Sequence, residues 1–416
     1  MTDLAPVQEA NRIKSLDVVR GFALLGILAV NAAFFAAPFQ AAQNPLLEPL
    51  AVTPDTLWSW LVMHVFFEFK MITLFSMLFG VSIFLVGGER SDKDRGKLLR
   101  RRLAWLFLFG LLHGTLLWYG DILLHYALCG FIVLLMRSWG VRTLFIVGTV
   151  LFALTTGIGG AFSAMMPMAP AESLEPMREQ MWSPSRETIE ATIAAYQSGA
   201  LSALQANFEV WSEFIWFMIF FMPRTIALML IGMALFKSGF FTGAAKAWVY
   251  WLAAAIGAGA LALVGWQAQI NADLEFEFLH MFSVGNFANS ALSPLISLFY
   301  ASLLILLVKA GAVKFLTNAL AAVGQMAFTN YLMQTIIMTT IFNGGRGLGL
   351  FGQVDRVELW GIVVGVWVLQ LIWSPLWLSR YSMGPFEWIW RRLSYARPVP
   401  IAKAAAPRRG LVEDNA

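Results

Sequence analysis

Seven polar side chains lie in strongly apolar surroundings and have the types that proton transfer requires. His64 and Glu68 are one helical turn apart, and Asp121 and His125 repeat that spacing, so the members of each pair face the same way. Polar and ionisable groups inside a bilayer are costly, and their default interpretation is functional. We predict that the whole group converges at one depth: Asn31, His64, Glu68, Lys70, His113, Asp121 and His125.

His113 is the strongest candidate for a general base in this group. It lies in the almost wholly apolar run 106–118, between Gly110 and Gly114. This G-x-x-x-G spacing lets another helix approach closely. A neutral imidazole can accept a proton near pH 7, whereas the alternative is a structural histidine that only satisfies hydrogen bonds. The predicted catalytic residues are His113, Asn31, Asp121 and Lys70.

The other members of the group have structural alternatives as well. His64 and His125 could be interfacial side chains with their polar tips in water, and Lys70 could extend to the headgroups. Asp121 closes the turn 119–121 and suits the N-cap of a following helix. These alternatives stay open at the level of sequence.

A second set of residues suits an anionic ligand such as a phosphate ester. Asp17 and Arg20 are three residues apart and share a helix face, although they could equally form a structural ion pair. Arginine binds phosphate through a fork of N–H donors, and an arginine deep in a membrane needs an anion. The predicted cofactor-binding residues are Asp17, Arg20, Arg100, Arg101, Arg102 and Arg224.

A polar stripe from Gln325 to Thr340 completes the candidate site. Such a stripe is as often interhelical hydrogen bonding as ligand contact. The residues predicted to bind substrate are His64, Glu68, His125, Asn330 and Gln334.

The composition explains where these residues must lie. The chain has 416 residues, of which 59% are hydrophobic and only 13% are charged, with a mean hydropathy of +0.68. A soluble protein is nearer half apolar and a quarter charged, so the chain is an integral membrane protein. The net charge of +4 forms no groove-sized cluster that would bind nucleic acid. Cys129 alone allows neither an internal disulfide nor a cysteine zinc site, and we expect no metal and no haem.

We predict an all-α fold, a polytopic membrane bundle of about ten helices, because a bilayer core needs roughly 20 apolar residues per helix. The expected stretches are 18–37, 57–86, 98–118, 122–136, 143–162, 210–236, 247–270, 292–308, 316–342 and 359–378. The second is too long for one straight helix, so its part before Glu68 lies at the interface or lines a cavity. The fourth is short.

Basic residues predict the topology. With ten spans, most of the 29 lysines and arginines fall on one side, so both termini are expected in the cytoplasm. The predicted parts are a cytoplasmic N-terminus 1–17, a first bundle 18–162, an external loop 163–209, a second bundle 210–396 and a disordered basic tail 397–416. The external loop is acidic and contains an expected amphipathic helix over 186–198.

Several segments together resemble the YeiB family of bacterial inner-membrane proteins. They are 16–28 with Asn31, 70–80, 110–114, 120–124, 229–232, 326–334 and 384–391. The resemblance covers nearly the whole chain and implies the fold of that family in the bacterial inner membrane.

A wider resemblance concerns the opening L-D-x-x-R-G-x-A…N, which is similar to that of transmembrane acyltransferases, including heparan-alpha-glucosaminide N-acetyltransferase. It implies an acyl group taken from cytoplasmic acyl-CoA, the expected co-substrate, and a catalytic role for Asn31. That family's catalytic histidine follows in the next external segment, but 34–56 contains no histidine here. Either His113 or His64 has then taken its role, or the activity is altered or absent.

The leading hypothesis is therefore an acyltransferase that acts on an extracytoplasmic or lipid-linked hydroxyl or amine. The rivals are a transporter or flippase for a small amphiphile, and a structural membrane protein. The lipid bilayer and acyl-CoA are the expected partners, and self-assembly is compatible with the sequence. No Walker loop, H-E-x-x-H or G-x-S-x-G motif supports another chemistry.

Overall fold

A computed structural model describes residues 12–403, which form helices joined by turns and short loops. Parts of the predicted segments 1–17 and 397–416 therefore lie outside the described residues. The helices are α1 (Lys14–Ala36), α2 (Phe39–Gln43), α3 (Leu57–Phe66), α4 (Lys70–Gly87), α5 (Lys93–Leu116), α6 (Leu123–Val133), α7 (Val141–Met165), α8 (Ala171–Met181), α9 (Arg186–Gln197), α10 (Ala200–Lys237), α11 (Ala247–Asp273), α12 (Phe278–His280), α13 (Phe287–Lys309), α14 (Lys314–Gln325), α15 (Ala327–Phe342), α16 (Arg356–Arg380) and α17 (Pro385–Tyr395).

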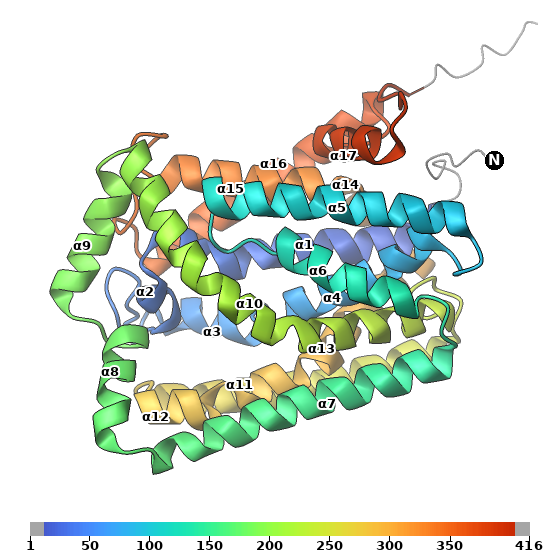
Figure 1. Ribbon diagram of the computed structural model, residues 1–416. Helices are drawn as coiled ribbons and strands as arrows, with labels where there is room; N and C mark the ends of the chain where they lie inside the picture. The colour runs from blue at the N-terminus through green and yellow to red at the C-terminus, as the bar shows by residue number, and fades with distance from the viewer. Residues whose placement is uncertain (1–11, 404–416) are drawn as a thin grey trace, which may run out of the picture.

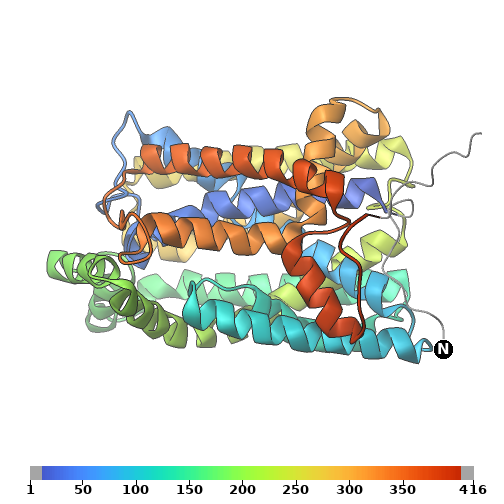
Figure 2. The same ribbon diagram turned by 90° about the horizontal axis from the view of Figure 1, so that it is seen from above.

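The long helices run side by side between two ends of the molecule (Figure 1). We call one of them the basic end, because it carries Arg12, Arg20, Arg102 and Arg391. Helices α8 and α9 lie at the opposite end. Helix α17 lies across the basic end, where Trp390 Nε1 donates to the carbonyl oxygen of Arg102 in α5 at 2.9 Å (Figure 2).

Helix α1 is the centre of the bundle, and most of its residues are buried. Glycines let α14 approach it closely. A Cβ atom at Gly21 would overlap the carbonyl oxygen of Leu320, and one at Gly324 would overlap the carbonyl oxygen of Asp17. Small residues at such contacts bring helix backbones together, which is how helices associate in membranes.

By length and apolarity, seven helical segments among the described residues could cross a membrane. They are Lys14–Ala36, Leu57–Gly87, Val141–Met168, Ala200–Lys237, Ala247–Asp273, Phe278–Lys309 and Arg356–Arg380. The three other predicted stretches correspond to α5, to α6, and to α14 together with α15. Helix α5 begins with a strongly charged segment, and α6 and α15 are short. The chain is thus an all-helical, multi-pass membrane protein.

Two predicted stretches are interrupted. The prediction of one continuous helix over 316–342 was wrong, because this stretch forms two helices, α14 and α15, which meet at Met326. The long second stretch breaks between α3 and α4, as its length indicated. The expected amphipathic helix is confirmed as α9, whose N-cap Ser185 accepts a hydrogen bond from Thr188 N at 3.2 Å, whereas α8 gave no clear sequence signal.

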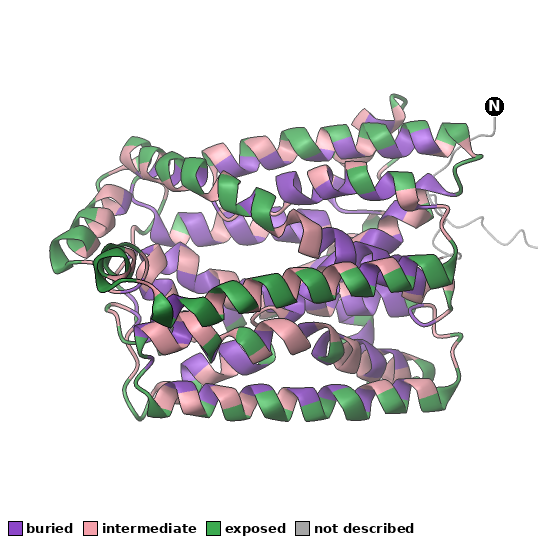
Figure 3. Cartoon of the chain, turned by 60° about the horizontal axis from the view of Figure 1, so that its bottom comes forward, coloured by how far each residue is buried: buried purple, intermediate pink, exposed green. Residues whose placement is uncertain are grey.

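The outward faces of the peripheral helices are exposed and apolar (Figure 3). On α7, Val150, Leu154, Ile158 and Phe162 recur every four residues, and all are more than half exposed. Exposed apolar stripes of this length are a liability in water but are the expected surface against lipid.

Candidate functional site

Two interruptions of the helices line the same central cavity, which has a volume of about 420 Å³. One is the break 67–69 between α3 and α4, and the other is the segment 117–122, which returns into the bundle before α6 begins. Phe69 adopts a φ of 60°, a conformation uncommon for a bulky residue. Irregular backbone at membrane depth is tolerated where it lines a cavity, and strained residues cluster at functional sites.

The central cavity brings together five of the residues predicted from sequence. Besides many aromatic side chains, its polar lining includes Asn31, Glu68, Thr73, Ser76, Asp121, His125, Arg224 and Thr225. The predicted convergence is therefore found for Asn31, Glu68, Asp121 and His125, whereas Arg224 was assigned to a different group. The cavity is not lined by the other three predicted residues, which are His64, Lys70 and His113.

His64 and Lys70 belong to one buried network beside the break. His64 Nδ1 lies 2.5 Å from Glu68 Oε2, and the imidazole stacks on Trp60. Lys70 Nζ donates to the carbonyl oxygen of His64 at 2.8 Å and to Asn289 Oδ1. Because both His64 and Lys70 are buried, their alternatives at the membrane interface are wrong. Sequence reasoning missed Asn289, whose only signal was an amide in an apolar stretch.

His113 lies between Asp121 and Thr335. Its Nδ1 is 2.9 Å from Asp121 Oδ1, and its Nε2 is 2.9 Å from Thr335 Oγ1. Asp121 Oδ2 also accepts from Leu124 N at 2.7 Å, so the carboxylate caps α6 as well as pairing with the imidazole. His113 is only 2% exposed and lines neither of the cavities of the site. Asp121 is the member of the pair that faces the cavity.

The glycines beside His113 have the expected packing role. A Cβ atom at Gly110 would overlap the backbone nitrogen of Leu124, and one at Gly114 would overlap the indole of Trp211. Helix α5 therefore contacts α6 and α10 closely on either side of His113. This packing fixes the imidazole against Asp121.

His125 is the histidine that lines the central cavity. Its Nε2 lies 2.8 Å from Thr225 Oγ1, and within residues 12–403 its Nδ1 has no side-chain hydrogen-bond partner. The imidazole is 8% exposed, so the interfacial alternative is wrong for His125 too. A ring nitrogen without a partner can exchange a proton with a bound ligand.

A second cavity, of about 350 Å³, opens at the basic end. Its charged lining residues are Arg12, Asp17, Arg20, Arg102, Glu387 and Arg391. Asp17 accepts from Arg12 Nε at 3.2 Å and from Arg20 at 2.8 Å. Four arginines outnumber two acids, and burial raises the pKa of the Glu387 carboxyl, so the wall is cationic.

Of the three consecutive arginines predicted to bind the cofactor, only one lines this cavity. Arg102 lines the cavity, and its guanidinium lies 4.2 Å from the centre of the Trp390 ring. Arg100 and Arg101 are exposed and do not line it. Arg12, Glu387 and Arg391 were missed, although 384–391 carried part of the family resemblance.

Ile122 and Tyr126 line both cavities and therefore form the septum between them. The Tyr126 hydroxyl lies 2.8 Å from Ser76 Oγ in the central cavity. On the other side, Tyr331 lines the basic-end cavity, and its hydroxyl oxygen accepts from Ile122 N at 3.4 Å. The two cavities thus share these two side chains as a common wall.

Asn330 and Gln334 face α16 and line none of the described cavities. Asn330 Nδ2 donates to Ser374 Oγ at 3.0 Å, and Gln334 Nε2 donates to Gln370 Oε1 at 2.9 Å. The structure thus places Asn330 and Gln334 in interhelical hydrogen bonds, the alternative that the sequence left open, whereas Gln325 and Tyr331 of the same stripe line the basic-end cavity.

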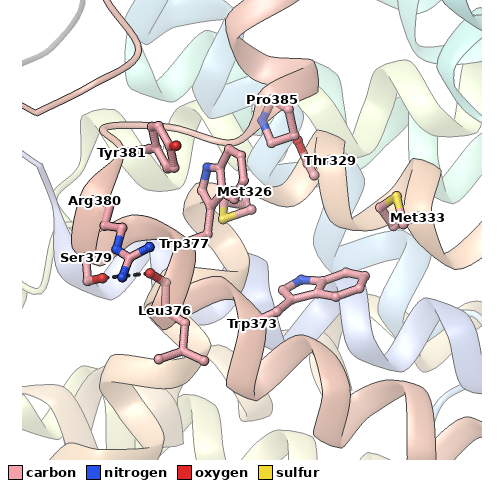
Figure 4. Close-up of a pocket in the computed structure, with 10 residues that line it drawn as sticks. All are labelled: Met326, Thr329, Met333, Trp373, Leu376, Trp377, Ser379, Arg380, Tyr381 and Pro385. Carbon is pink, nitrogen blue, oxygen red and sulfur yellow. Dashed lines mark hydrogen bonds between the residues drawn. The ribbon is translucent and has the colours of Figure 1, made fainter.

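A third cavity, of about 660 Å³, lies apart from these two, between α15, α16 and the start of α17 (Figure 4). Its lining is aromatic and aliphatic except for Thr329, Ser379 and Arg380. Within residues 12–403, no three histidine, cysteine or acidic side chains gather in a way that could hold a metal ion.

Comparison with known proteins places the chain among uncharacterised bacterial relatives. A family described as "Protein of unknown function (DUF418)" matches residues 235–397. The chain is 32% identical over 435 residues to the uncharacterized protein YxaH of Bacillus subtilis (strain 168), covering 97% of this chain and 99% of the relative. It is 31% identical over 396 residues to the uncharacterized protein YeiB of Escherichia coli (strain K12), covering 91% and 95%. No solved structure matches the chain.

Proposed function

The chain belongs to the YeiB-like family, and on that premise we propose that it is a transmembrane acyltransferase of the bacterial inner membrane. It moves an acyl group from cytoplasmic acyl-CoA to a hydroxyl or amine on the far side or on a lipid. The observation that carries the proposal is the pair of cavities that meet at Ile122 and Tyr126. One is cationic, and the other is lined by groups that can take a proton.

The proposal includes a topology of ten crossings with both termini in the cytoplasm. Helices α5, α6 and α15 add three crossings to the seven apolar segments. The concentration of arginines at the basic end supports a cytoplasmic location for that end, because cytoplasmic loops are rich in basic residues. The central cavity then lies toward the far side.

The basic-end cavity suits the phosphates of acyl-CoA. Arg102 and Arg391 form no ion pair with any acid of the described residues, and Arg20 shares Asp17 with Arg12. Arginine forks bind phosphate oxygens in pairs, so the nucleotide part of the ligand binds near these groups. The pantetheine arm then runs toward Ile122, with the thioester at the septum.

The reaction itself needs one base and one oxyanion donor. The acceptor hydroxyl or amine gives its proton to Asp121, and His113 shares that proton through its Nδ1. The acceptor heteroatom attacks the thioester carbonyl carbon, and the carbonyl oxygen takes up negative charge, which Asn31 Nδ2 stabilises by a hydrogen bond. The C–S bond then breaks, and the leaving CoA thiolate takes the proton back from the pair.

The remaining predicted residues bind the acceptor or hold the residues of the site in position. Glu68 and His125 bind the acceptor by hydrogen bonds, and His64, Lys70 and Asn289 hold Glu68 in place. Asn330 and Gln334 fix α15 against α16 and therefore position Thr335 beside His113.

A transporter or flippase for a small amphiphile is the second candidate. Two cavities on opposite sides of one thin septum are also what alternating access requires. The two functions separate experimentally, because a transporter moves its ligand intact, whereas an acyltransferase releases one CoA thiol for each acyl group transferred.

The test measures acyl-CoA-dependent thiol release by the full chain in membranes that contain natural acceptors. Asp121→Asn is expected to lower the rate about a hundredfold or more, since general-base catalysis contributes factors of this size. Asp55→Asn, at an exposed aspartate outside the cavities, serves as the matched control and is expected to retain the wild-type rate. Equal rates for both variants would contradict the proposal.

A further inference from the structure

Arg224 is a cation in the wall of the central cavity without an anionic partner. Its NH1 donates to Thr156 Oγ1 in α7 at 3.0 Å, and its NH2 donates to Ser290 O at 2.8 Å and Ser293 Oγ at 3.2 Å in α13. All three acceptors are neutral. Within residues 12–403, Arg224 has no acidic side chain in ion-pair distance.

The acids of the same cavity are already engaged. Glu68 pairs with His64, and Asp121 pairs with His113. A partly buried guanidinium in a membrane helix is costly without a counter-ion, and its five N–H donors exceed the three hydrogen bonds that it makes here. The guanidinium also lies 4.5 Å from the centre of the Phe152 ring, which is uncharged. The geometry therefore leaves donors and an unpaired positive charge for a ligand.

Hydroxyl groups extend this cationic wall. Thr73 Oγ1 lies 3.1 Å from Ser293 Oγ, which itself accepts from Arg224. Thr225 follows Arg224 in α10, and both threonines line the cavity. An arginine fork beside several hydroxyl donors is a suitable environment for a phosphate ester, whose oxygens only accept hydrogen bonds.

Aromatic residues show how such a ligand enters. Phe214, Phe217 and Phe221 are three and four residues apart, share one face of α10 and line the cavity. Phe217 is nevertheless 49% exposed, and its neighbours Trp216 and Phe220 are 74% and 71% exposed. The cavity thus reaches the lipid-facing surface of α10, so its opening admits an apolar chain from the bilayer.

We propose that the central cavity binds a phosphorylated amphiphile, with its phosphate on Arg224, Thr73 and Thr225 and its apolar tail leaving past Phe217. Its free hydroxyl or amine lies toward Asp121 at the other pole of the cavity. That this amphiphile is the acyl acceptor rests on the proposed function, whereas its binding does not. The group that Arg224 holds is then the acceptor's phosphate and not that of CoA, because Arg224 does not line the basic-end cavity.

Lipid binding to the purified, delipidated full chain in detergent tests this by native mass spectrometry. The probes are dioleoyl phosphatidylglycerol, dioleoyl phosphatidylethanolamine and undecaprenyl phosphate, each compared with dioleoylglycerol, which has the same tails as the first two but no phosphate. We expect at least one phosphorylated probe to bind about tenfold or more tightly than dioleoylglycerol, since hydrogen bonds to a charged group have this strength. Comparison of the phosphorylated probes with one another shows whether the ligand is a glycerophospholipid or a polyprenyl phosphate.

Variants locate the phosphate. Arg224→Gln should abolish the preference for phosphorylated probes, whereas Arg224→Lys, which keeps the charge and guards against a folding defect, should retain part of it. Arg380→Gln is the matched control, because Arg380 lines the third cavity at the bundle surface. Equal binding of all probes to the wild type, an unchanged preference in Arg224→Gln, or its loss in Arg380→Gln would overturn the proposal. Selective binding without thiol release would refute the acyltransferase function and leave this inference standing.

Discussion

Substitution of His113 by glutamine separates a catalytic imidazole from a structural one. The imidazole makes one contact with Asp121 Oδ1 and one with Thr335 Oγ1, both at 2.9 Å, and it is almost completely buried. A glutamine amide has similar bulk and offers one donor for Asp121 and one acceptor for Thr335, but it cannot take up a proton.

The two effects of the change therefore differ in size. Because glutamine can keep the hydrogen bond to Thr335 and the close polar contact with Asp121, the stability of His113→Gln should stay within about 1–2 kcal/mol of the wild type. In His113→Leu, Thr335 Oγ1 loses its hydrogen-bond partner and Asp121 loses its imidazole contact, and a buried polar group left without a partner costs about 1–3 kcal/mol. Turnover of a folded His113→Gln variant should nevertheless fall about a hundredfold or more, since Asp121 then lacks the imidazole that shares its proton and general-base catalysis contributes factors of this size.

The assay is acyl-CoA-dependent thiol release, together with thermal unfolding in detergent. His280→Gln is the control: His280 Nε2 contacts Asn271 Oδ1 at 2.9 Å, and the residue lines none of the described cavities. A folded His113→Gln variant with wild-type turnover would refute the role of His113.

Three further predictions follow from the topology, the cationic cavity and the helix packing. In a Cys129→Ala background, a cysteine at Ser91 should be labelled from the cytoplasmic side and one at Ser185 from the opposite side; labelling of both from one side would exclude ten crossings. Arg102→Gln should weaken acyl-CoA binding about tenfold, because it removes a charged donor from the cavity wall, whereas Arg101→Gln should leave the dissociation constant unchanged. Gly21→Ala should lower the free energy of unfolding by about 1–3 kcal/mol or more through overlap with Leu320, whereas Gly361→Ala, which meets no atom within 4 Å, should not; equal thermal midpoints would contradict the packing.

Local spacing predicted two short-range contacts. Asp17 with Arg20 in α1, and His64 with Glu68 across the end of α3, are three and four residues apart, and both pairs form as expected. Asp121 and His125 have the same spacing but contact His113 and Thr225 instead. The apolar runs also predicted that Asn31, Glu68, Asp121 and His125 converge, and all four line the central cavity.

Contacts between residues far apart in the chain could not be predicted, because they leave no regular spacing in the sequence. Thr335 lies 222 residues from His113 in the chain, and Asn289 lies 219 residues from Lys70. Asn330 and Gln334 have the spacing of a ligand-binding face, but their partners in α16 show that the same face serves packing.

The rotation of side chains around a helix explains why too many arginines of α5 were assigned to the cofactor site. Successive residues of an α-helix point about 100° apart, so Arg100, Arg101 and Arg102 cannot all face one cavity. The break at Met326 was missed for a different reason: residues 316–342 are apolar or weakly polar throughout, and neither proline nor a charged group marks the change of direction.

The most direct test of the central claim uses inverted membrane vesicles that contain the full chain and acyl-CoA labelled in its acyl group. Acyl-CoA does not cross the bilayer, so it reaches only the outward-facing cytoplasmic surface of these vesicles. We predict that label accumulates in a lipid or lumenal product, that one free CoA thiol appears outside for each acyl group transferred, and that Asp121→Asn abolishes both. Label that stays on CoA in wild-type vesicles, or transfer that persists in Asp121→Asn at the wild-type rate, would contradict the account.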